Sequence, residues 1–210
     1  MEEGIEQEPH KSPIWYVIGP LLILLVLIFL IPDFAFDVKE QPKDIPSLEE
    51  VRPQSLFDMD ITEARASAGQ LGSLEMADDQ MIKIIADTVA AKSCQGDKTC
   101  QAKSLYLFVR DNIDYISDPS REYIKSPHET LLTGGGDCDD MAVLLWNLEE
   151  AIGVQARYGT SPNHLFVEIS LPEAPEKYKK DGWIALDATC KSCTFGEVGP
   201  AVFYGERAFI

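Results

Sequence analysis

A cysteine, a histidine and an aspartate occur where they could form a catalytic triad. Cys138 lies in the stretch GGGDCDDMAVLL, at the start of an apolar segment; His164 follows the turn Ser161-Pro162-Asn163, and Asp187 ends the segment GWIALD. In such a set the imidazole takes the thiol proton, the carboxylate fixes the imidazole tautomer, and the sulfur attacks a carbonyl carbon. A histidine at the start of a strand is also often a simple polar edge residue, so the spacing alone leaves the triad open.

The segment that begins at Cys138 is predicted to be a helix. Apolar side chains recur along it at spacings of three and four, and Gly153 supplies its C-terminal stop. A thiol in the first turn lies beside free N–H groups and the positive end of the helix dipole, which favour thiolate. We expect Asp137 to cap the helix and Asp140 to accept first-turn N–H groups. Acidic neighbours that faced the thiol would raise its pKa, so a thiolate here needs a cationic partner.

The elements around this helix predict an α+β fold. Two amphipathic helices are expected before it, near residues 77–92 and 98–115, and three strands after it, at 154–159, 164–171 and 182–188. The alternation in the last two strands allows His164 and Asp187 to share a face. Helices followed by consecutive strands with polar connections indicate an antiparallel sheet covered by helices.

Composition and charge limit the class of protein. The chain has 210 residues, 45% of them hydrophobic, which is enough for one globular unit with its own core. Its formal net charge of −17 opposes contacts with phosphate groups, so DNA and RNA are not expected partners.

The N-terminal region predicts a membrane anchor. Residues 14–31 contain no charge, and an apolar run of this length nearly matches a bilayer core. A cleaved signal peptide is the less favoured alternative, because the leading residues are acidic and no A-x-A site follows. We therefore expect a short polar tail (1–13), a transmembrane helix (14–32), a proline-rich stalk with one short helix near 61–66 (33–75), and the main domain (76–210).

Five cysteines bear on the compartment. Four form two short-range pairs, Cys94 with Cys100 and Cys190 with Cys193, and Cys138 remains. Structural disulfides, within or between the pairs, are our preferred interpretation, and a zinc site with four cysteine ligands is an alternative. The distribution of basic residues favours a cytoplasmic domain by the positive-inside rule, but only weakly. The paired cysteines lead us to expect an extracytoplasmic domain.

Three ordered motifs resemble the transglutaminase-like superfamily. They are SPHETLLTGGGDCDDMAVLLWNLEEAIGVQARYG, HLFVEI and GWIALDAT, and FVRDNIDYI resembles the approach to the first of them. The family pattern has a G-x-C-x-D/E stretch opening a helix, a histidine beginning a strand, and an aspartate after W-x-x-x-D. The resemblance covers about residues 76–188, and Phe166 stands where the family usually has tryptophan.

The resemblance implies a papain-like α+β fold with Cys138 as nucleophile, His164 as base and Asp187 as orienting acid. Such enzymes make or break amide bonds through a thioester, and we favour hydrolysis, as in a protease or amidase, over amine transfer. The backbone N–H of Cys138 would contribute to the oxyanion hole, with Tyr115 as a candidate second donor. No cofactor or metal is expected.

A non-catalytic module of the same fold, which binds peptides or helps an assembly, is the alternative function. The presence of all three triad residues favours the enzyme, with a peptide or protein substrate. Of the remaining side chains, His128 is expected to face solvent beside Pro127, and Trp183 is expected in the core or as a wall of the cleft. The substrate and the oligomeric state do not follow from the sequence.

Overall fold

The computed structural model describes residues 13–30, 40–58, 68–118, 123–200 and 208–210. The chain divides into two units, Met1–Val38 and Lys39–Ile210. The helices of the second unit are α2 (Leu48–Val51), α3 (Gln80–Ser93), α4 (Lys98–Asn112), α5 (Pro127–Thr133) and α6 (Cys138–Ala151), with 3-10 turns η2 (Gln54–Leu56), η3 (Ala68–Leu74) and η4 (Glu176–Tyr178). Its strands are β1 (Asp114–Tyr115), β2 (Gly135–Gly136), β3 (Gln155–Ser161), β4 (His164–Ser170), β5 (Ile184–Leu186) and β6 (Ala208–Phe209).

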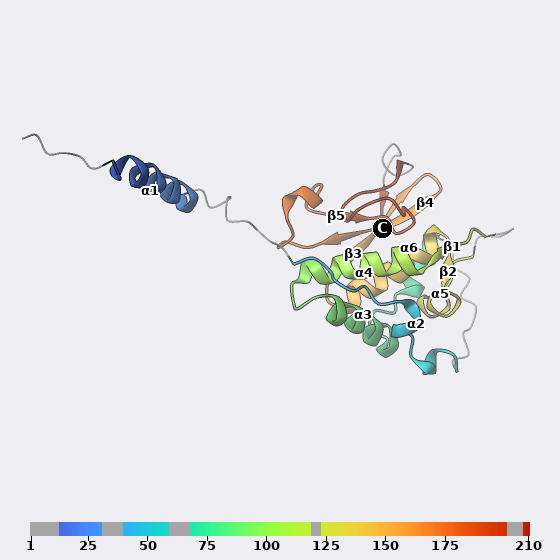
Figure 1. The fold of residues 1–210 in the computed structure, drawn as a ribbon. Coiled ribbons are helices and arrows are strands. Elements are labelled where there is room, and N and C mark those ends of the chain that lie inside the picture. The colour runs from blue at the N-terminus through green and yellow to red at the C-terminus, as the bar shows by residue number, and fades with distance from the viewer. Residues whose placement is uncertain (1–12, 31–39, 59–67, 119–122, 201–207) are drawn as a thin grey trace, which may run out of the picture. The chain divides into compact units, whose positions relative to one another are not determined.

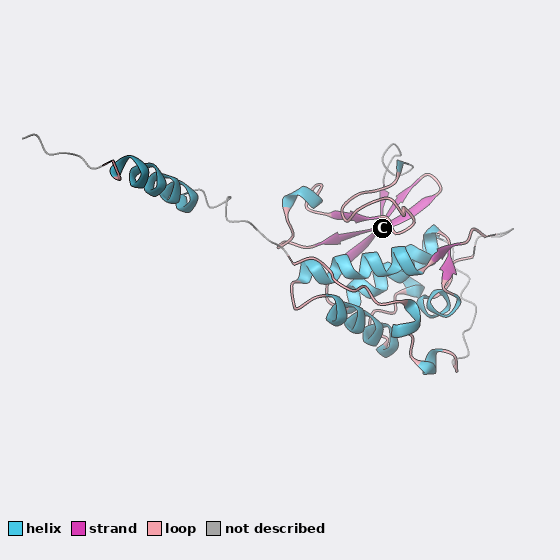
Figure 2. Cartoon of the chain, viewed as in Figure 1, coloured by secondary structure: helices cyan, strands magenta, loops and turns pink. Residues whose placement is uncertain are grey.

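The sheet and the helices form two layers, which confirms the expected α+β class. The four-stranded sheet has the order β5-β4-β3-β6, and every neighbouring pair is antiparallel. Helix α6 packs against β3 and β4 on one side and against α3, α4 and α5 on the other (Figures 1 and 2). The central helix is therefore enclosed almost all round, which explains its near-continuous apolar sequence.

The first turn of each long helix of this unit carries an aspartate cap. Asp79 accepts the N–H groups of Met81 and Ile82 at the start of α3, and Asp97 accepts that of Cys100 at the start of α4. Asp137 caps α6, as predicted. These carboxylates satisfy N–H groups that lack partners within a helix, and they fix where each helix begins.

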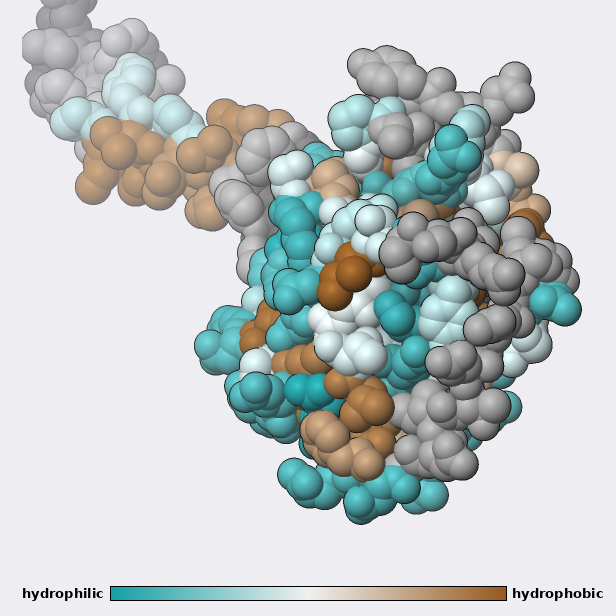
Figure 3. Space-filling view, turned by 90° about the vertical axis from the view of Figure 1, so that its right-hand side faces the viewer, coloured by the Kyte–Doolittle hydropathy of each residue, from teal (hydrophilic) through white to brown (hydrophobic). Residues whose placement is uncertain are grey.

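The described part of the N-terminal unit, residues 13–30, contains the helix α1 (Trp15–Leu30). Up to residue 27, its exposed side chains are largely hydrophobic, and many are brown in Figure 3. At about 1.5 Å per residue its 16 residues extend about 24 Å, short of a hydrocarbon core of about 30 Å. Within the described residues, no helix has the length and apolarity required to cross a membrane, so the predicted span over 14–32 is not supported. Its last two residues lie outside the described part.

Part of the predicted stalk packs into the domain. Leu48, Val51 and Leu56 are buried in the hydrophobic core. The backbone N–H of Leu48 donates to Asn112 Oδ1 at 2.9 Å, and Arg52 Nη1 donates to the carbonyl of Leu132 at 2.8 Å. The sequence did not predict this packing, because only isolated apolar side chains of the segment enter the core and they show no periodic pattern among its prolines and charges. The short helix expected near 61–66 lies outside the described residues.

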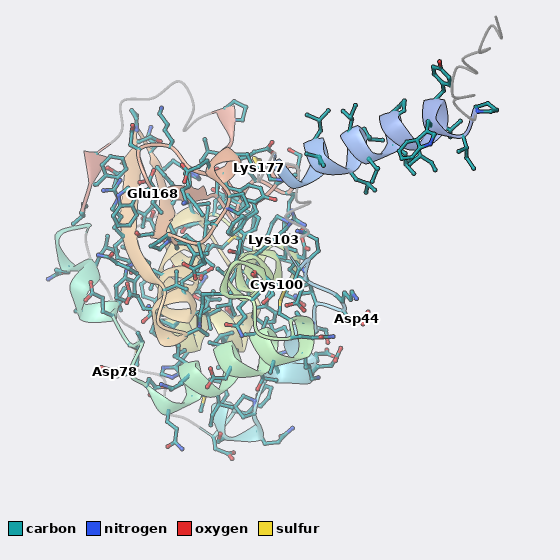
Figure 4. The ribbon with its side chains drawn as sticks, turned by 90° about the vertical axis from the view of Figure 1, so that its left-hand side faces the viewer. Asp44, Asp78, Cys100, Lys103, Glu168 and Lys177 are labelled. Atoms are coloured by element: carbon teal, nitrogen blue, oxygen red, sulfur yellow. A yellow bond between two sulfur atoms is a disulfide. The ribbon has the colours of Figure 1, made fainter. Side chains whose placement is uncertain are left out.

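Both disulfides form within the pairs, which confirms the structural interpretation. Cys94–Cys100 closes the turn between α3 and α4, and Cys190–Cys193 closes a loop after β5. Cys100, labelled in Figure 4, is buried in the first turn of α4. Cys138 is left as the free thiol, since all five cysteines are among the described residues.

His128 is buried rather than exposed, contrary to the prediction. It is 4% exposed, and its Nε2 lies 3.0 Å from Oδ1 of Asp79, the cap of α3. The sequence did not predict that the His128 side chain points inward, because it follows a proline and α5 is too short to show a periodic pattern. The pair links α5 to α3.

The buried carboxyl group of Glu149 is a source of instability. Its side chain is fully buried in α6, and neither oxygen has a hydrogen-bond partner. Burial raises the pKa of Glu149 well above its ordinary value, Lys98 opposes this shift, and Glu150 adds to it. The native state therefore binds the proton more tightly than the unfolded chain. The contribution of this group to stability is retained below the unfolded pKa and lost as the pH rises through the folded pKa.

Replacing Glu149 with Met should stabilise the protein at neutral pH by about 1–3 kcal/mol, because an apolar side chain of similar length removes the unsatisfied oxygens. Denaturant unfolding at pH 5 and pH 8 should show a larger gain at the higher pH. Exposed Glu173→Gln is the matched control and should change little. An equal loss of stability at both pH values would contradict the assignment.

Candidate active site

Cys138 is the first residue of α6, directly after its cap. Asp137 accepts the backbone N–H groups of Asp139 and Asp140, and Asp140 accepts that of Asp137, which forms a capping box. The segment before it is held by the parallel pairing of β1 with β2, where Tyr115 is in register with Gly136. The half-buried thiol is thus presented by a rigid turn at a helix N-terminus.

His164 begins β4, as predicted. Ser161 and His164 pair across the two-residue turn Pro162-Asn163, in which Asn163 adopts a φ of 59°. This turn orients the imidazole toward the end of the sheet nearest Cys138, and both side chains line one pocket of about 450 Å³. The next backbone N–H, that of Leu165, hydrogen-bonds to the Cys138 thiol.

Asp187 directly follows β5, and its carboxylate contacts the imidazole of His164. His164 Nε2 lies 3.2 Å from Asp187 Oδ1, and the two side chains are 13% and 3% exposed. The ring nitrogen has no aligned hydrogen bond, so the contact is an ion pair when the imidazole is protonated. Asp187 also accepts hydrogen bonds from Thr189 Oγ1 at 2.7 Å and from the backbone N–H of Gly199 at 3.0 Å.

The pKa values of the Asp187 carboxyl and the Cys138 thiol are shifted in opposite directions. Burial alone would raise the pKa of Asp187, but its contacts with His164, Thr189 and Gly199 outweigh this and leave it below the ordinary value. Burial raises the pKa of the Cys138 thiol to about 12; the charges of Asp139 and Asp137 add to the shift, and the Leu165 N–H opposes it. The resting thiol is therefore protonated at neutral pH, and a base must remove its proton for it to act as a nucleophile.

Tyr115, the candidate oxyanion donor, lines the same pocket and is 54% exposed. Partial burial raises its pKa, and the charges of Cys138, Asp137 and Asp139 add to the effect. Its hydroxyl thus remains a proton donor beside the thiol at neutral pH.

Trp183 does not line this pocket. It borders a second pocket of about 420 Å³ together with Glu168, which is labelled in Figure 4. The guanidinium carbon of Arg157 lies 3.9 Å from the centre of the Trp183 ring, and Arg157 Nε donates to Glu168 Oε2 at 3.0 Å. Trp183 is only partly buried and does not wall the cleft, so both expectations for it are wrong; its ring packs against the guanidinium of Arg157 instead.

Sequence reasoning missed three residues that support the site. Thr189 and Gly199 hold Asp187, and Lys125 pairs with Asp140 in the turn that carries Cys138. Thr189 could have been suspected, because a hydroxyl two residues after an aspartate is within local reach. Gly199 and Lys125 carry no local signal, since their contacts depend on tertiary structure.

Phe166 packs across β3 where the sheet approaches His164. A Cβ on Gly159 would lie 2.4 Å from Phe166 Cζ, so the ring occupies the space above this glycine. Gly159→Ala should destabilise the protein by about 1–3 kcal/mol through this overlap. Thermal unfolding should detect the loss, and Phe166→Leu in the same chain should restore part of it. Gly72→Ala, whose Cβ would have no atom closer than 3.9 Å, is the control.

Among the described residues, no group of three or more histidine, cysteine, aspartate or glutamate side chains is arranged to hold a metal ion.

One family model matches part of the second unit. Residues 86–188 match the family model of the transglutaminase-like superfamily, which supports a transglutaminase-like domain in this part of the chain. No curated protein matches the sequence.

The chain is also similar to solved structures, among them a candidate cysteine protease from Cytophaga hutchinsonii, 18% identical with a TM-score of 0.44. The similarity covers 69% of this chain and 54% of that one, so the chain spans about half the length of that protein. LapG from Legionella pneumophila is 20% identical with a TM-score of 0.40, over 66% of this chain and 82% of LapG. A candidate protease from Parabacteroides distasonis is 15% identical with a TM-score of 0.40, over 56% and 29%.

Proposed function

We propose that the protein is a cysteine hydrolase that cleaves peptide or protein amide bonds, with Cys138 as nucleophile, His164 as base and Asp187 as orienting acid. The observation that carries the proposal is the contact of His164 with Asp187 at 3.2 Å, at the pocket that Cys138 also lines. The backbone N–H of Cys138, the first residue of α6, is the proposed first oxyanion donor, and Tyr115 is the proposed second donor.

In the proposed reaction, His164 takes the thiol proton as the sulfur bonds to the substrate carbonyl carbon. The protonated imidazole, stabilised by Asp187, then gives this proton to the leaving amine as the amide bond breaks. Water, deprotonated by His164, attacks the resulting thioester and releases the acid and the thiol. An amine in place of water would give transfer instead.

A peptide library incubated with the full-length protein, with and without a primary amine, tests the reaction. Mass spectrometry should detect cleaved peptides that depend on Cys138, and more of them than amine-modified peptides. Predominant amine incorporation would replace hydrolysis by transfer as the reaction. Absence of both products would contradict the enzyme.

The high pKa of the Cys138 thiol favours the alternative of a non-catalytic peptide-binding or assembly module. Iodoacetamide labelling near neutral pH separates the two functions. An enzyme should show Cys138 labelled faster than a free thiol, and His164→Ala should remove this excess. Labelling no faster than a free thiol, unaffected by His164→Ala, would leave the binding module.

We further propose that the domain works in an oxidising compartment outside the cytoplasm. The two disulfides support this, since such bonds rarely persist in the cytosol. Protease added to intact cells should degrade the domain, and complete protection would contradict the proposal.

A further inference from the structure

Lys125, just before α5, reaches the turn that carries Cys138. Its Nζ donates to Asp140 Oδ2 and to the carbonyl of Gly135, each at 3.0 Å. Its backbone N–H donates to Asp140 Oδ1 at 2.7 Å. The Asp140 side chain is fully buried and that of Lys125 is 15% exposed, so the ion pair is shielded from solvent. Lys125 therefore supplies both a charge and a backbone bond to one buried carboxylate.

Asp140 in turn holds the residues before the nucleophile. Its Oδ2 accepts the backbone N–H of Asp137 at 3.2 Å, and a Cβ on Gly136 would lie 2.5 Å from its own Cβ. The turn of residues 135–138 is thus fixed between this carboxylate and strand β1. A buried carboxylate without a counter-charge is costly, so the arrangement depends on Lys125.

The charged and titratable groups around the thiol come from several elements. Asp137, the cap of α6, and Asp139, in its first turn, lie beside the thiol, and their charges add to the effect of burial in raising its pKa. Tyr115 from β1, Asp118 from the following loop and His164 from β4 line the same pocket. Asp140, in the same turn of α6, differs from the other aspartates of the motif because its charge is matched by Lys125.

We propose that Lys125 is a positioning residue for the reaction of Cys138: it neutralises the buried Asp140 carboxylate and holds the turn that presents the thiol. The effect of Lys125 on catalysis depends on the proposed function, whereas its effect on the reactivity of the thiol does not. Lys125 acts through Asp140 and does not touch the reacting sulfur. Without its ammonium group, a third negative charge would act on the thiol and disfavour the thiolate.

Alkylation of the full-length protein by iodoacetamide across a pH series tests this role, because the other four cysteines are in disulfides. Lys125→Met should lower the rate at neutral pH by about tenfold and shift the profile to higher pH, whereas Asp140→Asn should shift it to lower pH. Lys125→Met combined with Asp140→Asn should restore the wild-type profile, and Lys125→Arg should stay close to it.

Opposite shifts of the two single variants, with recovery in the double variant, would support the proposal, because a purely structural brace would impair both singles and the double alike. An unchanged profile in Lys125→Met, or the same loss in all three variants, would overturn it. The measurement needs no substrate. It therefore decides the role of Lys125 separately from the peptide-library experiment, which decides the proposed function.

Discussion

Cys138→Ala should abolish turnover of every peptide that the wild-type protein cleaves. Loss of the nucleophile in enzymes of this mechanism lowers kcat on the order of 10⁶-fold, because no thioester can form. Among the described residues, Cys138 is the cysteine that is not in a disulfide, and it lines the same pocket as His164. Product formation under single-turnover conditions, together with the mass of any covalent adduct, measures the effect.

The variant should keep its fold, since the thiol makes a small contribution to packing. Its melting temperature should stay within a few degrees of the wild type, which separates a chemical loss from unfolding. Retention of wild-type turnover by Cys138→Ala would show that another group performs the chemistry. The assignment of the pocket would then be wrong.

Asp187→Asn should lower kcat by about 10⁴-fold with little change in KM, as expected when an amide no longer stabilises the imidazolium or fixes its tautomer. The change is nearly isosteric, and the hydrogen bond from the Gly199 N–H can still be accepted by the amide oxygen. A split between kcat and KM is informative because a general loss of structure would affect both.

Asp181→Asn is the matched control for this change, because Asp181 is exposed in the turn before β5 and its positive φ of 54° suits asparagine. It should leave both constants unchanged. A decrease of less than about tenfold in Asp187→Asn would indicate that His164 works without this carboxylate.

The pH dependence of the site follows from the lowered pKa of Asp187. A carboxyl group whose folded pKa lies below its unfolded value contributes stability above the unfolded pKa and loses it as the pH falls through the folded pKa. The Asp187 carboxylate should therefore persist at mildly acidic pH. Nuclear magnetic resonance of a 13C-labelled Asp187 carboxyl should place its titration midpoint below the ordinary value of an aspartate side chain.

The parts of the fold with strong periodicity were predictable from the sequence. Helix α6 and strand β4 repeat apolar residues at the periods of a helix and a strand, so their starts at Cys138 and His164 were correctly placed. The pairing of His164 with Asp187 followed from alternation on neighbouring strands.

The remaining contacts depend on packing that has no local pattern. Lys125 and Asp140 are separated by a helix and a turn, and only the tertiary fold shows that their charges cancel. The burial of Glu149 ran against expectation, since a glutamate near the end of a helix is usually solvated. Leu48 and Leu56 stand among prolines and charges, where single apolar residues produce no periodic signal.

The position of Leu48, Val51 and Leu56 in the core affects how the domain can be produced in isolation. A recombinant fragment that starts at residue 76, where amphipathic helices begin in the sequence, would lack these three side chains, expose the core residues that they cover and favour aggregation. A fragment that starts at residue 39 keeps the segment that supplies these side chains. The segment of residues 40–58 is thus part of the smallest fragment expected to fold, and N-terminal deletions should stop before it.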